Sequence, residues 1–165
     1  MNEFSFPQLV VSVNETRKAY HKLTIIVGPA GSGKTRLLKQ LAGTLRLPTL
    51  NFGLHFSQRL LDLTRRQRAL KSEDIAIDVI EEHLQSGLCL DDTELLFDST
   101  LRLNPITFLQ EVSRNRLLVA TWNGTLTAGE LRFAYPGHPD FFSQAVSGYP
   151  VISIAEDKLH LYLTT

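Results

Sequence analysis

The residues best suited to chemistry are the eight from Gly28 to Thr35, which read Gly-Pro-Ala-Gly-Ser-Gly-Lys-Thr. This run fits the pattern G-x4-G-K-[ST] at every fixed position, and it lies between a short apolar run and an amphipathic stretch, which is the context that the motif needs. Its glycines let backbone N–H groups turn toward phosphate oxygens, and the helix that begins there adds free N–H groups and the positive end of its dipole. We therefore predict a phosphate-binding loop.

The side chains of this loop have separate expected roles. Lys34 is expected to reach the β- and γ-phosphates, and the Thr35 hydroxyl is placed to ligate Mg²⁺. The predicted nucleotide-binding residues are Gly28, Pro29, Ala30, Gly31, Ser32, Gly33, Lys34, Thr35 and Arg36. The chain has no Asn/Thr-Lys-x-Asp run that would specify guanine. We therefore expect ATP rather than GTP.

A phosphate-binding loop of this kind needs a carboxylate at the end of a second strand, and the sequence offers two alternatives. In the first, residues 88–90 form the strand and Asp91 is the metal-site acid. In the second, residues 95–97 form the strand and Asp98 takes the metal role. We favour Asp91, because Gly87 is expected to end a helix just before it and acidic residues gather there.

Five further side chains are candidates for catalysis. Asp92 or Glu94 would polarise the attacking water, and because Asp92 stands where a Glu is more usual, slow hydrolysis and use of Glu94 both stay open. Asn123 follows a buried strand and is either a γ-phosphate sensor or a hairpin residue, since Asn-Gly favours tight turns. Arg114 and Arg116 are either arginine fingers for a neighbouring subunit's nucleotide or surface cations at a helix end.

The elements that must position these residues alternate between strand and helix. Helices are predicted over 7–20, 34–45, 54–70, 73–85 with Ser72 as its cap, and 105–114, and strands over 23–27, 47–53, 88–90 and 117–122. Alternating stretches near 131–135, 151–154 and 159–163 predict a hairpin and further strands, with Asp157-Lys158 as a tight turn. The predicted fold is α/β, a P-loop NTPase core with a mostly parallel sheet flanked by helices and with added antiparallel strands.

Length and charge limit what else the chain can hold. Its 165 residues correspond to one domain at about 150 residues per domain. We divide it into an N-terminal helix over 1–21, a nucleotide-binding core over 23–122 and C-terminal strands over 123–165, which leaves no room for a helical lid domain. Lys and Arg total 17 and so do Asp and Glu, so the net charge is zero. That balance argues against a protein that depends on bare contacts with polyanions.

One local basic cluster stands out against this neutral background. It consists of Arg65, Arg66 and Arg68, for which we expect a solvated helix face, with a DNA or partner contact or a kinase lid as alternatives. The single cysteine, Cys89, has no partner for an internal disulfide. The N-terminal residues lack the pattern of a signal peptide, and no apolar run approaches the ~18 residues that cross a membrane. We therefore expect a cytoplasmic protein.

A combination of five segments, in this order along the chain, carries a resemblance to a known family. They are Gly28–Thr35, Leu90–Asp98, Ser113–Arg116, Thr121–Gly124 and Tyr135–Pro139. With them the chain resembles the BrxF family, the small P-loop proteins of type 3 BREX bacteriophage-exclusion systems, over most of its length. The resemblance implies a bacterial, cytoplasmic, nucleotide-binding subunit of a defence system whose other components include a larger ATPase, a methyltransferase and an alkaline-phosphatase-like protein.

The leading hypothesis is a Mg²⁺-dependent ATPase whose nucleotide state controls assembly. The expected partners are other BREX defence proteins or further copies of this chain, with DNA contacted only indirectly or through partners and with no membrane contact. One alternative is a module that binds nucleotide with little or no hydrolysis. A small-molecule kinase ranks last.

Overall fold

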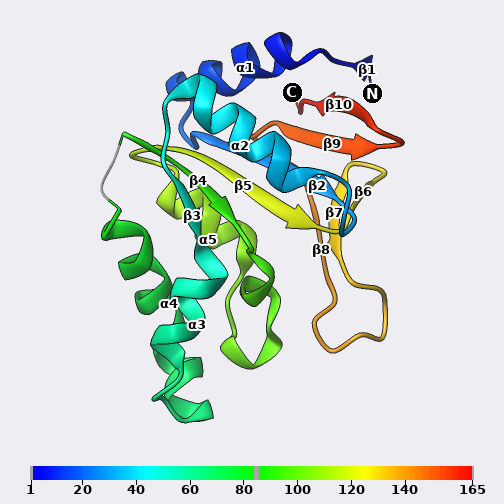
Figure 1. The fold of residues 1–165 in the computed structure, drawn as a ribbon. Helices are drawn as coiled ribbons and strands as arrows, with labels where there is room; N and C mark the ends of the chain where they lie inside the picture. The colour runs from blue at the N-terminus through cyan, green and yellow to red at the C-terminus, as the bar shows by residue number, and fades with distance from the viewer. Residues whose placement is uncertain (1, 84–85, 165) are drawn as a thin grey trace.

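The fold is built around one mixed sheet with helices on both faces (Figure 1). A computed structural model describes residues 2–83 and 86–164. The strand order of the seven-stranded sheet is β1-β10-β9-β2-β5-β4-β3. Its strands are β1 (Asn2–Glu3), β2 (Leu23–Gly28), β3 (Thr49–Asn51), β4 (Gly87–Asp91), β5 (Leu117–Asn123), β9 (Val151–Ala155) and β10 (Lys158–Tyr162). The run from β9 to β3 is parallel and β10 and β1 are antiparallel, which confirms the predicted α/β class with a mostly parallel sheet.

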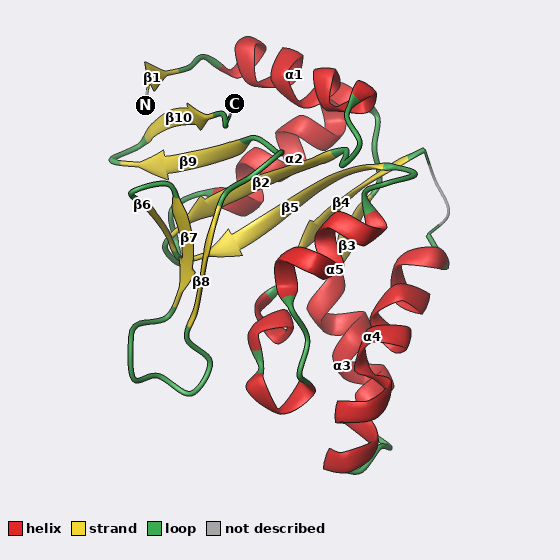
Figure 2. Ribbon diagram, turned by 180° about the vertical axis from the view of Figure 1, so that it is seen from behind, coloured by secondary structure: helices red, strands yellow, loops and turns green. Residues whose placement is uncertain are grey.

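The helices divide between the two faces of this sheet. They are α1 (Phe6–Glu15), α2 (Lys34–Leu45), α3 (Phe52–Leu60), α4 (Arg65–Glu81) and α5 (Pro105–Val112), with short 3-10 helices η1 (Thr16–Lys18), η2 (Glu94–Phe97) and η3 (Ser99–Leu101). Figure 2 shows α3, α4 and α5 in front of the sheet, whereas α1 and α2 lie on the other side. Within the described residues, no helix combines the length and apolar character needed to cross a membrane.

Strand β2 is buried on both faces and determines where the phosphate-binding loop begins. Leu23, Ile25 and Val27 join the core beneath α3, α4 and α5, while Ile26 faces the core beneath α1 and α2. A strand covered on both faces reads as a continuous apolar run, which is why the sequence predicts it. The predicted bounds of α2 are also confirmed, since it spans Lys34–Leu45.

The prediction for the next two helices is wrong at their boundary. The chain breaks before α4, which begins after Thr64, and the capping box of Thr64 and Gln67 supplies its first hydrogen bonds. Ser72 lies inside α4 instead of capping it, and its buried hydroxyl donates to the Leu101 carbonyl at 2.7 Å. The end of the predicted helix at 84–85 lies outside the described residues, and Gly87 opens β4 rather than ending a helix.

Two other predicted boundaries differ by a few residues. The strand predicted over 47–53 is only Thr49–Asn51, because Asn51 caps α3 by accepting from the backbone N–H of Leu54. In the β9–β10 hairpin the turn residues are Glu156 and Asp157, both in the left-handed region. Lys158 already pairs with Ala155 in the sheet, so it is not part of the turn.

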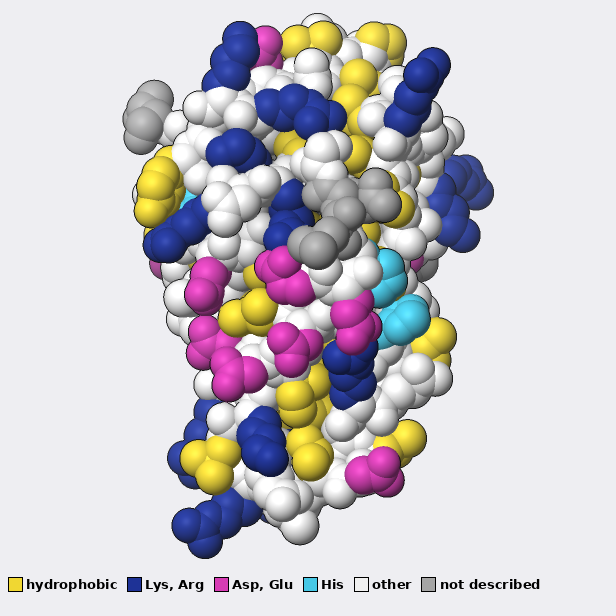
Figure 3. Space-filling model, turned by 90° about the vertical axis from the view of Figure 1, so that its left-hand side faces the viewer, with side chains coloured by type: hydrophobic (Ala, Val, Ile, Leu, Met, Phe, Trp, Pro, Cys, Tyr) yellow, Lys and Arg dark blue, Asp and Glu magenta, His cyan; other side chains and the backbone are white. Residues whose placement is uncertain are grey.

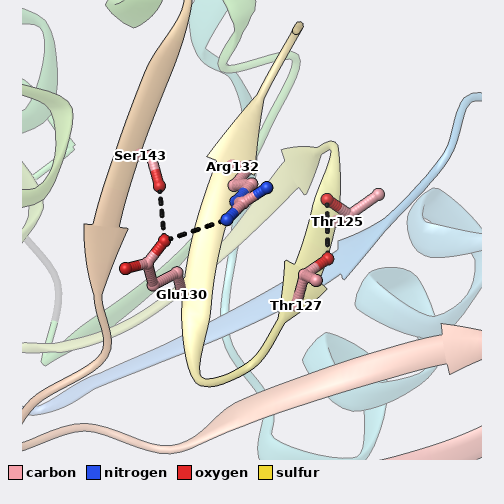
Figure 4. Close-up of polar contacts among 5 residues, drawn as sticks. All are labelled: Thr125, Thr127, Glu130, Arg132 and Ser143. Atoms are coloured by element: carbon pink, nitrogen blue, oxygen red, sulfur yellow. Dashed lines mark hydrogen bonds and ion pairs between the residues drawn. The ribbon is translucent and has the colours of Figure 1, made fainter. Parts of the chain in front are cut away.

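A second, three-stranded antiparallel sheet follows β5 and was only partly predicted. Its strands are β6 (Thr125–Thr127), β7 (Glu130–Phe133) and β8 (Phe142–Ala145). Figure 4 shows Glu130 accepting from Arg132 at 3.2 Å and from Ser143 at 3.0 Å, which ties β7 to β8. Leu131 is fully buried, and the Trp122 indole N–H donates to the Arg132 carbonyl. These contacts anchor the small sheet to the end of β5.

Candidate functional site

The carboxyl ends of β2, β5 and β4 meet at one edge of the sheet and enclose a cleft of about 470 Å³. Because β5 lies between the other two strands, the residues at its end stand between the phosphate-binding loop and the acids. The residues that line the cleft are Ala30, Gly31, Gly33, Lys34, Thr35, Arg36, Asp91, Asp92, Glu94, Thr121 and Asn123. The structure therefore brings together most of the predicted site residues, drawn from three strands.

The loop between β2 and α2 is an open cradle. Gly31 and Gly33 have φ values of +78° and +98°, and a Cβ atom added to either would meet nothing within 4 Å. At Gly28 a Cβ would lie 2.5 Å from the Ser32 hydroxyl, so the chain needs glycine there for close approach. The geometry leaves space in front of the loop and fits a bound phosphate group.

Lys34 extends back across this loop. Its side chain is largely buried, and its ammonium donates to the Pro29 carbonyl at 2.7 Å. Burial lowers the pKa of Lys34, while the negative charges of Glu94 and Asp91 oppose that shift. An ammonium group that is partly stripped of water and lies beside open space interacts strongly with an incoming anion.

Asp91, at the end of β4, is held by three donors. The Thr35 hydroxyl donates to one carboxylate oxygen at 2.7 Å, and the Thr121 hydroxyl and the Asp92 backbone N–H donate to the other at 2.9 Å each. A hydroxyl and a carboxylate in contact, beside a phosphate cradle, are the oxygen ligands that Mg²⁺ takes from protein when phosphates supply the rest. The residues thus fit this ion. Sequence reasoning missed Thr121, although the register that pairs Leu90 with Ala120 places it next to Asp91.

Asp92 and Glu94 lie on the far side of the cleft from the loop. Asp92 has a left-handed φ of 56° and packs so closely on α3 that a Cβ on Gly53 would lie 2.5 Å from its carboxylate. Glu94 accepts a short hydrogen bond from the Asn123 amide through one oxygen. Its other oxygen is buried and has no partner among the described residues. Burial, followed by the proximity of the Asp92 carboxylate, raises the pKa of Glu94 to about 7.

The alternative placement of the metal-site acid at Asp98 is wrong in its structural premise. Residues 95–97 lie in the 3-10 helix η2 and not in a strand. The Asp98 carboxylate instead caps η3, accepting from the backbone N–H of Thr100 at 2.9 Å and from its hydroxyl at 2.6 Å. The strand predicted before Asp91 is present as β4.

Arg114 and Arg116 lie away from the cleft, before the start of β5. Arg116 is buried beneath α4 and pairs with Glu81 at 2.8 Å. Reaching a neighbouring subunit would break this ion pair, so the structure lends no support to an arginine finger at Arg116, which stays a prediction. Arg114 is exposed, with its guanidinium 5.4 Å from the centre of the Tyr20 ring. Its role as a finger stays a prediction.

No protein-family model matches this chain, and no curated protein does. Among solved structures, the chain is similar to C. elegans PCH-2, with 22% sequence identity over 72% of this chain and a TM-score of 0.40. The match covers 35% of the PCH-2 chain. A likeness this distant carries no argument about activity, and the resemblance to the BrxF family stays a prediction.

Proposed function

We propose that this protein binds ATP together with Mg²⁺ and hydrolyses it. The observation that carries the proposal is the 2.7 Å hydrogen bond from Thr35 to Asp91, which joins the phosphate-binding loop to the acid at the end of β4. It supports the proposal because a hydroxyl and a carboxylate in contact, beside a glycine-rich loop and a largely buried ammonium, are the groups that bind Mg²⁺ and phosphates in such sites. Phosphoryl transfer depends mainly on positioning and on electrostatic stabilisation, and these groups supply both.

The residues divide the work between holding phosphates and holding the metal ion. The backbone N–H groups of the loop and the Lys34 ammonium hold the phosphate oxygens. Thr35 and Asp91 would hold Mg²⁺, and the hydroxyl of Thr121 keeps the Asp91 carboxylate oriented. When bound, the ion neutralises negative charge on the phosphate oxygens.

Glu94 is the residue best placed to orient the attacking water. Glu94 lines the cleft together with Lys34 and Thr35, and the Asn123 amide holds one of its oxygens, which fixes the carboxylate at that wall. A general base works best when its pKa lies near the operating pH, and that of Glu94 is raised to about 7. Asp92 acts on Glu94 rather than on the substrate, because its negative charge helps to raise that pKa.

The metal assignment predicts a difference between two nearby aspartates. Asp91→Asn is expected to raise the Mg²⁺ concentration for half-maximal phosphate release by roughly 10- to 100-fold, because a neutral amide is a poorer ligand. Asp98→Asn serves as the matched control and should leave that concentration unchanged. The measurement is phosphate release against Mg²⁺ at fixed ATP. Loss of activity in Asp98→Asn alone would reverse the assignment.

The pH dependence of turnover tests the role of Glu94. Because its pKa is raised to about 7, kcat/KM for ATP should rise as Glu94 ionises, by about tenfold between about pH 6 and about pH 8. Asp92→Asn removes a neighbour that raises this pKa, so the midpoint of the profile should move to lower pH. A profile that keeps its midpoint in Asp92→Asn would remove the link between the two carboxylates.

One observation favours a second function, a nucleotide-binding module with little hydrolysis. With a pKa of about 7, a large part of Glu94 is protonated at neutral pH and unable to polarise water. Tight ATP binding without phosphate release at any pH would support this reading. The small-molecule kinase alternative has no such support. Its basic lid would have to close over the cleft, whereas Arg65 and Arg66 line a groove that is separate from the cleft.

We also propose, on the sequence resemblance alone, that the protein is a component of a BREX defence assembly. Its expected partners there are other defence proteins or further copies of the chain. A type 3 BREX cluster around its gene would support the assignment. An unrelated genomic neighbourhood would count against it.

A further inference from the structure

A second groove, separate from the nucleotide cleft, lies between the first turns of α4 and the 3-10 helix η3. It has a volume of about 610 Å³, and three arginines line it. Arg65 and Arg66 come from α4 and Arg102 follows η3, and we call this feature the arginine groove. Figure 3 shows Lys and Arg side chains both above and below a central band of acidic side chains, and those below it lie at the end of the molecule toward which α3 and α4 extend in Figure 1.

The charges of the arginine groove are uncompensated. Among the residues that the structure describes, no side-chain hydrogen bond or ion pair involves Arg65, Arg66 or Arg102, and no Asp or Glu is among the groove's lining residues. Arg68 differs, since its guanidinium donates to the Leu63 carbonyl at 3.1 Å and so closes the loop before α4. The neutral net charge of the chain therefore conceals a local excess of positive charge.

Two of these arginines lie where the dipole of α4 disfavours a positive charge. Arg65 and Arg66 are the first two residues of α4, and its first turn holds no acidic residue. Cations at this end of a helix are unfavourable, because the helix dipole is positive there. The dipole therefore does not account for two arginines in this turn. The arrangement is therefore better explained by attraction to an anion.

The groove is also held in shape before any ligand arrives. The buried Ser72 hydroxyl on α4 donates to the Leu101 carbonyl of η3 at 2.7 Å, which fixes the two walls against each other. The exposed Ser99 lies on the η3 wall and adds a hydroxyl to the guanidinium groups. Because the two backbone walls are fixed, only the arginine side chains have to be ordered when a ligand binds, which lowers the entropic cost.

We propose that the arginine groove binds the phosphodiester backbone of a nucleic acid. Guanidinium groups bind phosphate with paired hydrogen bonds, and hydroxyl groups also contact phosphate oxygens at protein–DNA interfaces. No aromatic side chain lines the groove to stack on bases, so the contact is with phosphates and independent of sequence. A protein partner would need an apolar anchor, and Leu70 is the sole large apolar side chain in the lining. The proposal does not rest on ATP hydrolysis.

Fluorescence anisotropy with a labelled DNA duplex of about 20 base pairs tests the proposal, with salt raised from about 50 to about 200 mM. Three phosphate contacts predict a slope of log K against log salt near −2.7, from about −0.9 per contact. The double variant Arg66→Gln/Arg102→Gln should reduce the magnitude of that slope by about two. It should also weaken DNA binding at least about tenfold at low salt. Arg17→Gln combined with Lys39→Gln removes two exposed cations elsewhere and should change neither quantity.

Three results would overturn the proposal: no DNA binding by the unaltered protein, an equal loss in the two double variants, or competition by polyglutamate as strong as by unlabelled DNA. The last would indicate an acidic protein as the ligand. Unchanged thermal unfolding and ATP turnover in Arg66→Gln/Arg102→Gln would show that the variant is folded. If its unfolding temperature falls, Arg66→Lys with Arg102→Lys decides, since it retains the charges and should retain the salt slope.

Discussion

Replacing Lys34 by alanine is expected to lower kcat/KM for ATP by about 10²- to 10³-fold. The Lys34 ammonium lies across the loop, is largely removed from water and has open space in front of it. A charge in such a position stabilises the phosphate oxygens most where negative charge builds up during transfer, and alanine cannot replace it. Phosphate release and the affinity for a fluorescent ATP analogue measure the two parts of the loss.

The matched control for this variant lies on the same helix. Lys39 is exposed on α2, so Lys39→Ala removes a positive charge without touching the cleft and should leave turnover unchanged. Thr35→Ala tests the neighbouring position and should raise the Mg²⁺ requirement, since it removes the hydroxyl that contacts Asp91. Turnover of Lys34→Ala at the unaltered rate would remove the proposed function altogether.

The sequence predicts those parts of the site that are built from residues close together along the chain. The loop from Gly28 to Thr35, the buried run of β2 and the helical spacing of α2 follow one another without interruption. Each signal is local and each agrees with the next, so the predicted bounds of α2 match the observed ones. The strand before Asp91 could be predicted for the same reason.

The break between α3 and α4 was missed because hydrophobic spacing continues through it. Leu60, Leu61 and Leu63 read as one apolar face, although Leu61 is exposed in the structure. A local signal did exist, because Thr64 and Gln67 have the spacing of a capping box. Hydrophobic periodicity favours a later boundary than this capping box does, and the observed boundary is the one that the capping box marks.

Contacts between distant segments could not be read from the sequence at all. Glu94 and Asn123 are joined by a hydrogen bond across 29 positions, and Arg116 and Glu81 by an ion pair across 35. The first contact is the reason why the proposed function assigns the attacking water to Glu94 rather than to Asp92. The second contact holds Arg116, a candidate arginine finger, in a buried position. Both depend on how parallel strands and helices are ordered in space, which spacing along the chain does not specify.

Replacing Glu94 by glutamine is expected to separate hydrolysis from binding. Phosphate release should fall about 10²- to 10⁴-fold, because a neutral amide cannot accept the proton of the attacking water. ATP affinity should be retained or increased, since the substitution removes a negative charge from the wall of the cleft that holds the phosphates. Single-turnover phosphate release and equilibrium binding of a fluorescent ATP analogue measure the two effects on the same preparation.

Asp92→Asn and Asn123→Ala are the companion variants that make this result specific to Glu94. Asp92 is exposed, and its negative charge helps to raise the pKa of Glu94, so Asp92→Asn should retain turnover with a shifted pH profile. Asn123→Ala removes the donor that holds the Glu94 side chain and should give an intermediate loss. Full turnover in Glu94→Gln with none in Asp92→Asn would make Asp92 the general base. The proposed roles of the two carboxylates would then be exchanged.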